Sequence, residues 1–139
     1  MWYQKEIVIK DKCRGFHLIT DEIVKNFKEI NKTTIGLLHL FIKHTSASLT
    51  INENCDEDVR NDFENHFNKM IPEGIKYYNH ISEGIDDMPA HIKTSILGNT
   101  LIIPIKNGNL NLGTWQGIYL CEHRNVSSNR KIVLTLQGN

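Results

Sequence analysis

The sequence predicts a single α+β domain built mostly on antiparallel β-sheet. Six or seven short segments have the character of strands, and hairpin-type connections, rather than regularly alternating helices, join them. A chain of 139 residues is long enough to enclose one core and too short for two. We therefore expect residues 1–139 to form one domain with two main helices.

The first part of the chain predicts two strands and a short helix. Residues 2–10 alternate between apolar and polar side chains, and residues 16–20 form a second short strand. Thr20 can cap a helix whose first turn carries Asp21 and Glu22, where the helix dipole favours negative charge. The buried positions of this helix recur at helical spacing: Ile23, Phe27 and Ile30.

The middle of the chain predicts the centre of the sheet, followed by an amphipathic helix. Residues 35–51 are apolar on both faces of an extended chain, which indicates a strand covered on both sides. Residues 54–70 begin with acidic side chains and then repeat apolar ones at helical spacing. The apolar positions of this helix are Val59, Phe63, Phe67 and Met70.

A long loop and a second main helix follow. Residues 72–87 contain the glycines and polar side chains of a loop, and loops of this length are often functional. Residues 88–97 predict a helix that Gly98 ends. We expect this helix to bury one stripe: Met88, Ile92 and Ile96.

The last part of the chain predicts further antiparallel strands. Residues 100–123 contain two strand segments around the turn dipeptide Asn107-Gly108, which is typical of a hairpin. Residues 130–137 form the final strand.

The charge balance excludes some classes of partner. Sixteen basic residues match sixteen acidic ones, so the chain has no global field to collect nucleic acid or an anionic membrane. A net charge near zero also does little to oppose self-association.

The cysteines and the N-terminus bear on the compartment. Cys13, Cys55 and Cys121 lie far apart without a CxxC spacing, so we interpret them as reduced intracellular thiols. The first ten residues carry charges throughout, unlike a signal peptide, and no apolar run is long enough to span a membrane. We therefore expect a cytoplasmic protein.

The segment EGIDDMPAHIK, residues 83–93, combines a helix start with polar residues that a helix start does not explain. Pro89 suits the first helical turn, and Asp87 is the natural N-cap. Asp86 and His91 remain unexplained. We therefore assign Asp86 and Asp87 as the candidate catalytic carboxylates, with Asp86 suited to proton transfer and Asp87 placed to orient His91.

Histidines on different elements predict a metal site. His91 lies near the positive end of its helix, which favours a neutral imidazole with a free lone pair, although a lone histidine there would be a half-buried packing residue. His80 in the loop and His44 at the end of the central strand are further candidate ligands, and His123 is a weaker candidate. Such a set suits a divalent metal, zinc first and magnesium as an alternative.

An anionic substrate would need additional contacts. Ser46 follows His44 in a run of small hydroxyl residues that suits the floor of a pocket. Four basic residues could add positive charge, although each is more often a solvated surface group: Lys93, Lys106, Arg124 and Arg130. We select Ser46, Lys93 and Arg124 as the candidate substrate contacts. No GxGxxG, Walker A, GxSxG or CxxC motif is present, so dinucleotide binding, P-loop phosphotransfer and esterase chemistry lose their usual support.

Four blocks of sequence resemble one known family along almost the whole chain. They are GLLHLFIKHTSASLTINENCDEDV, EGIDDMPAHIKTSILG, GTWQGIYLCEHR and RKIVLTLQG, and they resemble the YjbQ family, known as secondary thiamine-phosphate synthase enzymes. The resemblance implies sheets packed as a sandwich, a homotrimer, and a histidine cluster near the subunit boundary suited to a divalent metal. Carried over by motif, the histidines are His44, His80 and His91, with His123 as a weaker member.

The resemblance also implies thiamine-phosphate synthase activity, which joins a pyrimidine pyrophosphate to a thiazole phosphate. That reaction releases pyrophosphate, which normally calls for magnesium and several basic groups, and the chain shows no obvious cradle for it. We therefore expect a metal-binding enzyme that acts on a small phosphorylated metabolite and has weak thiamine-phosphate synthase activity. The alternatives are a non-catalytic trimeric module that binds a ligand or metal, and a purely structural trimer.

Overall fold

A computed structural model describes all residues, 1–139, and contains three α-helices and eight strands. The helices are α1 (Thr20–Asn26), α2 (Glu57–Met70) and α3 (Asp87–Leu97), with a 3₁₀ helix, η1, over Lys28–Lys32. The strands are β1 (Trp2–Ile9), β2 (Gly15–Leu18), β3 (Ile35–Ile42), β4 (Ala47–Glu53), β5 (Thr100–Lys106), β6 (Asn109–Leu110), β7 (Gln116–Glu122) and β8 (Arg130–Gly138).

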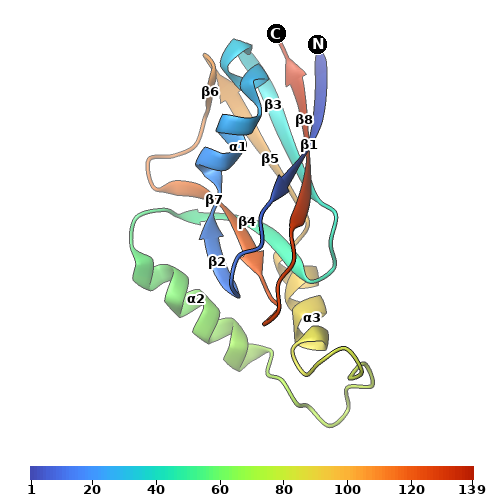
Figure 1. The fold of residues 1–139 in the computed structure, drawn as a ribbon. Helices are drawn as coiled ribbons and strands as arrows, with labels where there is room; N and C mark the ends of the chain where they lie inside the picture. The colour runs from blue at the N-terminus through green and yellow to red at the C-terminus, as the bar shows by residue number, and fades with distance from the viewer.

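The strands form two sheets that enclose one core. One sheet has the order β1-β8-β3-β5-β6 and the other the order β2-β7-β4, and every strand pair is antiparallel. A cluster of 18 buried apolar residues lies between the two sheets, α1 and η1. Helices α2 and α3 lie at the end of the molecule away from the chain termini, and the loop between them forms the tip (Figure 1). The predicted single α+β domain on antiparallel sheet is confirmed, with three α-helices rather than two.

The predicted central strand over residues 35–51 is wrong, because the segment forms two strands in different sheets. β3 lies in the middle of the five-stranded sheet, whereas β4 is an edge of the three-stranded sheet. The crossover between them, residues 43–46, carries His44 to the point where the two sheets separate. Only one face of β3 is buried: Leu40 lies in the core, whereas Leu37 is exposed.

Helix α1 buries the predicted stripe but has a different N-terminus. Ile23, Phe27 and Ile30 are all buried, the last two just beyond α1 as the chain passes into η1. Thr20 is the first helical residue and not the cap, because its hydroxyl accepts a hydrogen bond from the backbone N–H of Ile118 at 2.9 Å. That bond ties the start of α1 to β7.

Helix α3 contradicts two predictions. It begins at Asp87, and no side chain caps its N-terminus, because the Asp87 carboxylate contacts other side chains. The expected stripe is also rotated: Ile96 is 56% exposed, whereas Lys93 and Ala90 are buried. Gly98, with φ of 103°, ends the helix as predicted.

The remaining elements follow the predicted pattern in part. α2 begins after Asp56, whose side chain accepts from the N–H of Asp58 as an N-cap. Asn107 and Gly108 both have positive φ and join β5 to β6, which confirms the hairpin turn. The hairpin stops at residue 110, because β7 leaves this sheet and pairs with β2 and β4.

None of the helices has both the length and the apolar character that a membrane span requires.

Candidate metal centre at the head of helix α3

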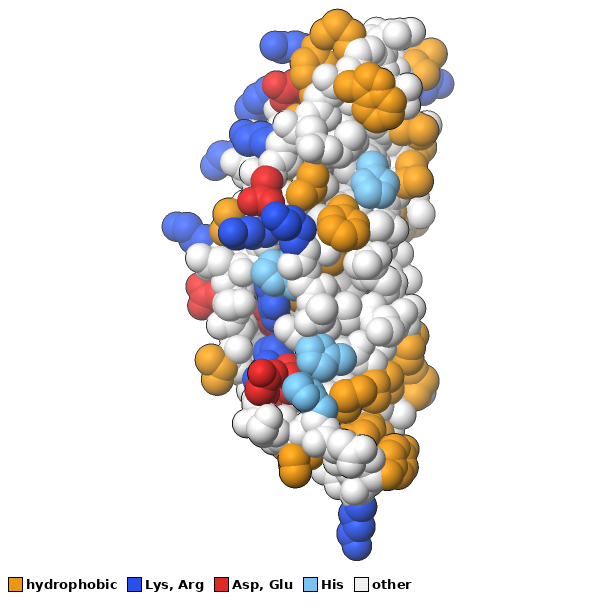
Figure 2. All heavy atoms as spheres, turned by 90° about the vertical axis from the view of Figure 1, so that its right-hand side faces the viewer, with side chains coloured by type: hydrophobic (Ala, Val, Ile, Leu, Met, Phe, Trp, Pro, Cys, Tyr) orange, Lys and Arg blue, Asp and Glu red, His pale blue; other side chains and the backbone are white.

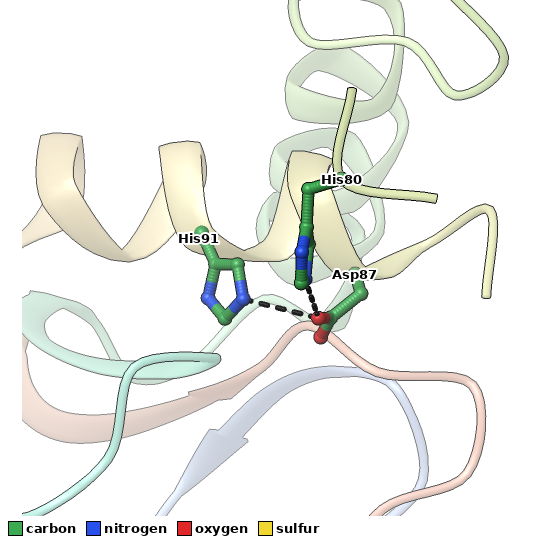
Figure 3. Close-up of side chains that lie close together, drawn as sticks. All are labelled: His80, Asp87 and His91. Carbon is green, nitrogen blue, oxygen red and sulfur yellow. Dashed lines mark hydrogen bonds and ion pairs between the residues drawn. The ribbon is translucent and has the colours of Figure 1, made fainter. Parts of the chain in front are cut away.

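Three side chains from the loop and from α3 converge on one point. The nearest ligand atoms of His80, Asp87 and His91 all lie within 4.8 Å of one another. Asp87 and His91 are one helical turn apart on α3, so their side chains lie on the same helix face, and His80 approaches from the preceding loop (Figure 3). Figure 2 shows histidine side chains gathered beside acidic ones at the surface.

The hydrogen bonds of His91 leave a lone pair directed at a carboxylate. His91 Nδ1 lies 2.8 Å from the carbonyl oxygen of Thr45, which can only accept, so Nδ1 carries a hydrogen. In the neutral ring, Nε2 is then an acceptor, and it lies 3.0 Å from Asp87 Oδ2, another acceptor. This contact is favourable only when a proton or a metal cation lies between the two atoms.

His80 approaches the same carboxylate oxygen from the solvent side. Its Nε2 lies 2.6 Å from Asp87 Oδ2 and 3.5 Å from a carboxylate oxygen of Glu83, and the side chain is 40% exposed. One oxygen of Asp87 therefore has two imidazole nitrogens near it, and the site stays open to solvent on the His80 side.

Arg124 holds the carboxylates of the site in place. It donates to Asp87 Oδ1, to Asp86 Oδ2 at 2.9 Å, and to the carbonyl oxygen of Glu83 at 2.8 Å. The N–H of Asn125 also donates to Asp86 Oδ2 at 2.9 Å. The Arg124 guanidinium, which connects β7 to the loop and to α3, thereby fixes three parts of the chain together.

Both aspartates stay ionised despite their burial. Burial alone would raise the pKa of Asp87, but hydrogen bonding to His80 and the positive charge of Arg124 hold that pKa below its usual value. Burial would also raise the pKa of Asp86, but hydrogen bonds from the Asn125 N–H and from Arg124 outweigh burial and lower that pKa. Asp86 faces Arg124 and Asn125 and makes no hydrogen bond to the two histidines.

The structure places His44 beside this group and not in it. The backbone N–H of Lys131 donates to His44 Nε2 at 2.7 Å, and His44 Nδ1 lies 3.4 Å from Arg130 Nη1. His44 and His91 nonetheless line the same cavity of about 590 Å³. The other residues that line it are Thr45, Thr94, Ser95, Gly98 and Asn99.

His123 lies in the interior, away from the converging group. It is 1% exposed, its Nε2 forms a 2.8 Å hydrogen bond with the Ser48 hydroxyl, and its Nδ1 has no partner. Burial, together with the charges of Lys93 and Arg14, lowers the pKa of His123 to about 3. His123 is therefore a neutral interior histidine.

The three predicted substrate contacts already have partners in the protein. All three guanidinium nitrogens of Arg124 donate within the site described above. Lys93 is 1% exposed and donates to Asn68 Oδ1 at 2.6 Å, and burial lowers its pKa. The hydroxyl of Ser46 accepts from Arg130 at 3.1 Å.

Two features of the site were not assigned from the sequence. Glu83 approaches His80, and Glu122 forms a buried ion pair with Arg130. The sequence offered Arg130 as a possible source of positive charge that is more often solvated at the surface, yet it is 4% exposed. The one sequence signal for its burial is its position as the first residue of the predicted last strand. In the structure Arg130 begins β8 and pairs with Ile9 of β1.

The donor set suits one class of metal. Two imidazole nitrogens and one carboxylate oxygen, with room for further ligands, are typical of zinc and similar transition metals. Magnesium prefers an all-oxygen, octahedral set, so the three residues fit it less well.

The chain is similar to proteins that share one family description. The family profile described as "UPF0047 protein YjbQ-like" matches residues 5–139. The UPF0047 protein YjbQ of Salmonella typhimurium is 56% identical over 138 residues, which are 99% of both chains. The protein of the same name in Escherichia coli O157:H7 is 52% identical over 138 residues, again 99% of both chains.

Solved structures share the fold. An uncharacterized conserved protein of the YjbQ/UPF0047 family from Clostridium acetobutylicum is 38% identical, with a TM-score of 0.80 over 93% of this chain and 97% of its own. A YbjQ-like protein from Sulfolobus solfataricus has a TM-score of 0.85 at 23% identity and covers 100% of this chain and 99% of its own. None of these names states a reaction.

The burial of His123 predicts a pH-dependent stability. The unfolded chain binds a proton at this residue below about pH 6.5, whereas the folded chain does not until about pH 3. The free energy of unfolding should therefore fall with decreasing pH across this range, with His123 contributing about 1.4 kcal/mol per pH unit. Urea unfolding between about pH 6 and about pH 5, where most carboxyl groups of the unfolded chain stay ionised, measures this slope.

The variant His123→Gln removes the titrating group and keeps a polar partner for Ser48, so its slope should be smaller by about 1.4 kcal/mol per pH unit. His66→Gln, at an exposed position of α2, controls for the loss of a histidine. Equal slopes for wild type and His123→Gln would contradict the account of a buried neutral ring.

Proposed function

This chain belongs to the UPF0047 family of YjbQ-like proteins, and we propose that it is a metal-dependent enzyme that acts on a small phosphorylated metabolite. In this proposal His80, Asp87 and His91 hold one divalent cation, zinc first among the candidates. The family membership indicated by the sequence blocks is confirmed, and the activity is the proposal.

One observation carries the metal proposal. The lone pair of His91 Nε2 and the carboxylate oxygen of Asp87 face each other at 3.0 Å, while the Thr45 carbonyl fixes the hydrogen on the far side of the ring. A backbone carbonyl that orients a ligating imidazole in this way is the usual outer-shell partner of a metal-bound histidine.

The surrounding residues support the same assignment. Arg124 binds Asp87 Oδ1 and so leaves Oδ2 as the oxygen that faces the histidines. Asp86 holds Arg124 from the other side. In this proposal Asp87 takes the ligand position that the sequence suggested for His44, and Asp86 positions the guanidinium.

A zinc ion in this place would polarise a phosphoryl oxygen or lower the pKa of a bound water. The protein residues contribute position and access: Asp87 and His91 are fixed on a helix, and His80 lies on the exposed loop. The cavity beside His91 gives a small substrate a place next to the proposed ion. We extend the proposal to weak thiamine-phosphate synthase activity, which the family resemblance suggests.

A second candidate is a ligand-binding module without turnover. The observation that favours it is the engagement of Arg124 and Lys93 by other protein groups, which leaves neither cation free to take the pyrophosphate that the synthase reaction releases. In that case the same site would retain a phosphorylated ligand and release it unchanged.

We also propose that the protein assembles as a homotrimer. The supporting feature is the outer face of the five-stranded sheet, where apolar side chains are exposed around a shallow hollow of about 350 Å³. Figure 2 shows such hydrophobic side chains gathered on the upper part of the face that also bears the histidines. The most exposed are Trp2, Val8, Ile35, Leu37 and Ile102. An exposed apolar patch of this kind commonly marks an interaction surface.

The trimer can be tested by light scattering on purified protein. We expect a molar mass three times the chain mass of 16.1 kDa, and a mass near that of one chain after Ile102→Glu, because a charge would be buried without a partner. Lys28→Glu, on η1, is the control for an added acidic residue. A wild-type mass equal to one chain would contradict the proposal.

Metal content tests the site itself. Wild-type protein incubated with zinc and then desalted should retain about one equivalent, whereas His80→Ala together with His91→Ala should lower zinc affinity by at least roughly tenfold, because two of three ligands are lost. The double variant His17→Ala, His66→Ala removes two histidines outside the group and should keep the wild-type content. Unchanged zinc content in the His80, His91 variant would show that the ligands are elsewhere.

Turnover distinguishes the enzyme from the binding module. The purified protein is incubated with the pyrimidine pyrophosphate and the thiazole phosphate, with and without a chelator. Product that disappears with the chelator and returns with zinc is the result that the enzyme proposal predicts. Retention of either phosphate without product would support the module instead.

A further inference from the structure

Two hydrogen-bond donors face each other beside the candidate metal centre. The Lys131 N–H can only donate, so His44 Nε2, 2.7 Å away, must accept, and the neutral His44 ring carries its hydrogen on Nδ1. Arg130 Nη1, which also can only donate, lies 3.4 Å from His44 Nδ1. The N–H groups of His44 Nδ1 and Arg130 Nη1 therefore face each other, and no acceptor lies between them.

The rest of the Arg130 guanidinium is fixed. Nε donates to Glu122 at 2.8 Å, and Nη2 donates to Glu122 at 2.5 Å and to the Ser46 hydroxyl at 3.1 Å. The Arg130 side chain is 5% exposed and that of Glu122 is fully buried. Movement of Arg130 would therefore break the ion pair and leave the Glu122 charge buried without a partner. Nη1 is left as the one guanidinium nitrogen without an acceptor, and it is directed at His44.

The charges around His44 favour an anion. Burial, and then Arg130, Lys131 and Lys43, lower the pKa of His44, against the single opposing effect of Glu122. Three cations therefore lie near the ring; Arg130 is paired with Glu122 and Lys43 with Glu6 at 2.7 Å, which leaves Lys131 as the cation without an ion pair. A metal cation is disfavoured here for the same reason, and neither ring nitrogen offers a free lone pair to bind one.

A third donor lies next to this pair. The Ser46 hydroxyl accepts from Arg130 Nη2, and its own hydrogen has no acceptor in the protein. Ser46 and His44 both lie in the crossover between β3 and β4, on either side of Thr45, whose carbonyl orients His91.

We propose that His44 Nδ1 and Arg130 Nη1 form an oxyanion subsite that receives a phosphoryl oxygen of the substrate. An acceptor oxygen placed there would satisfy both N–H groups and gain a charge-assisted hydrogen bond from the guanidinium. Because His44 and His91 line one cavity of about 590 Å³, a small phosphate ester could contact this subsite and the metal centre together.

The assignment of this subsite to a substrate rests on the proposed function, whereas the binding of phosphate to it does not. It replaces the earlier candidate contacts, since Arg124 and Lys93 have their donors engaged elsewhere. The subsite should therefore prefer a ligand group with several acceptor oxygens, such as phosphate, to a group with a single uncharged carbonyl.

Titration of metal-free protein with inorganic phosphate tests the subsite without any contribution from the metal. Isothermal calorimetry on chelator-treated wild-type protein should detect phosphate binding. His44→Ala should weaken it about tenfold or more, because one of the two donors is lost. Arg130→Lys keeps the charge opposite Glu122 but loses the second terminal nitrogen, and should weaken phosphate binding similarly. His66→Ala, at an exposed position of α2, is the matched control and should bind phosphate as wild type does.

The outcomes separate this inference from the metal proposal. Phosphate binding that persists without metal and falls in His44→Ala supports the subsite, even if the protein takes up no zinc. Phosphate binding that requires zinc, or that is the same in His44→Ala and wild type, overturns it and leaves the metal centre untouched. Acetate binding as strong as phosphate binding would overturn the assignment to a phosphoryl group. If Arg130→Lys fails to fold, the His44→Ala comparison decides alone.

Discussion

The buried carboxylate of Asp87 is the interaction on which this end of the molecule depends. At 1% exposure the ionised group needs partners on every side, and it finds Arg124 at one oxygen and the two histidines at the other. Those partners come from the β7–β8 connection, the long loop and α3. One charge therefore links three segments of the chain, and the loop carrying His80 acquires a defined position next to the helix.

The crossover between the two sheets brings the second half of the site to the first. Because β3 and β4 belong to different sheets, residues 43–46 cross from one to the other, and two of them, His44 and Thr45, line the adjacent cavity. Thr45 orients His91 through its carbonyl, while His44 and Ser46 contact Arg130. The proposed metal centre and oxyanion subsite are thus neighbours because adjacent residues of one short segment serve them both.

Much of the fold could be predicted from the sequence, because it depends on local patterns. The strand segments, the Asn107-Gly108 turn and the end of α3 at Gly98 follow from alternation and from backbone preferences, and the structure has them where expected. The split of residues 35–51 could not be predicted, since both sheets require apolar side chains and the composition does not change at the crossover.

The candidate site could be predicted in part for a related reason. His80 and His91 stood out because helix formation did not explain them, and the structure brings these two histidines together with Asp87, which the sequence assigned as the helix cap and a catalytic carboxylate rather than as a ligand. His44, the third predicted ligand, lies beside the group and not in it. The burial of Lys93 and Arg130 could not be foreseen, because a basic side chain is solvated unless specific polar partners surround it, and those partners come from distant segments. The rotation of α3 has the same origin: its buried face carries Asp87, which bonds to Arg124, and Lys93, which bonds to Asn68, so Ile96 is left at the surface.

The most direct test of the central claim is anomalous diffraction at the zinc absorption edge from crystals of zinc-loaded protein. The account predicts one strong peak per chain at about 2.0–2.2 Å from His80 Nε2, Asp87 Oδ2 and His91 Nε2. A peak bound instead by His44 or His123, or no peak in protein that has been saturated with zinc, would contradict it.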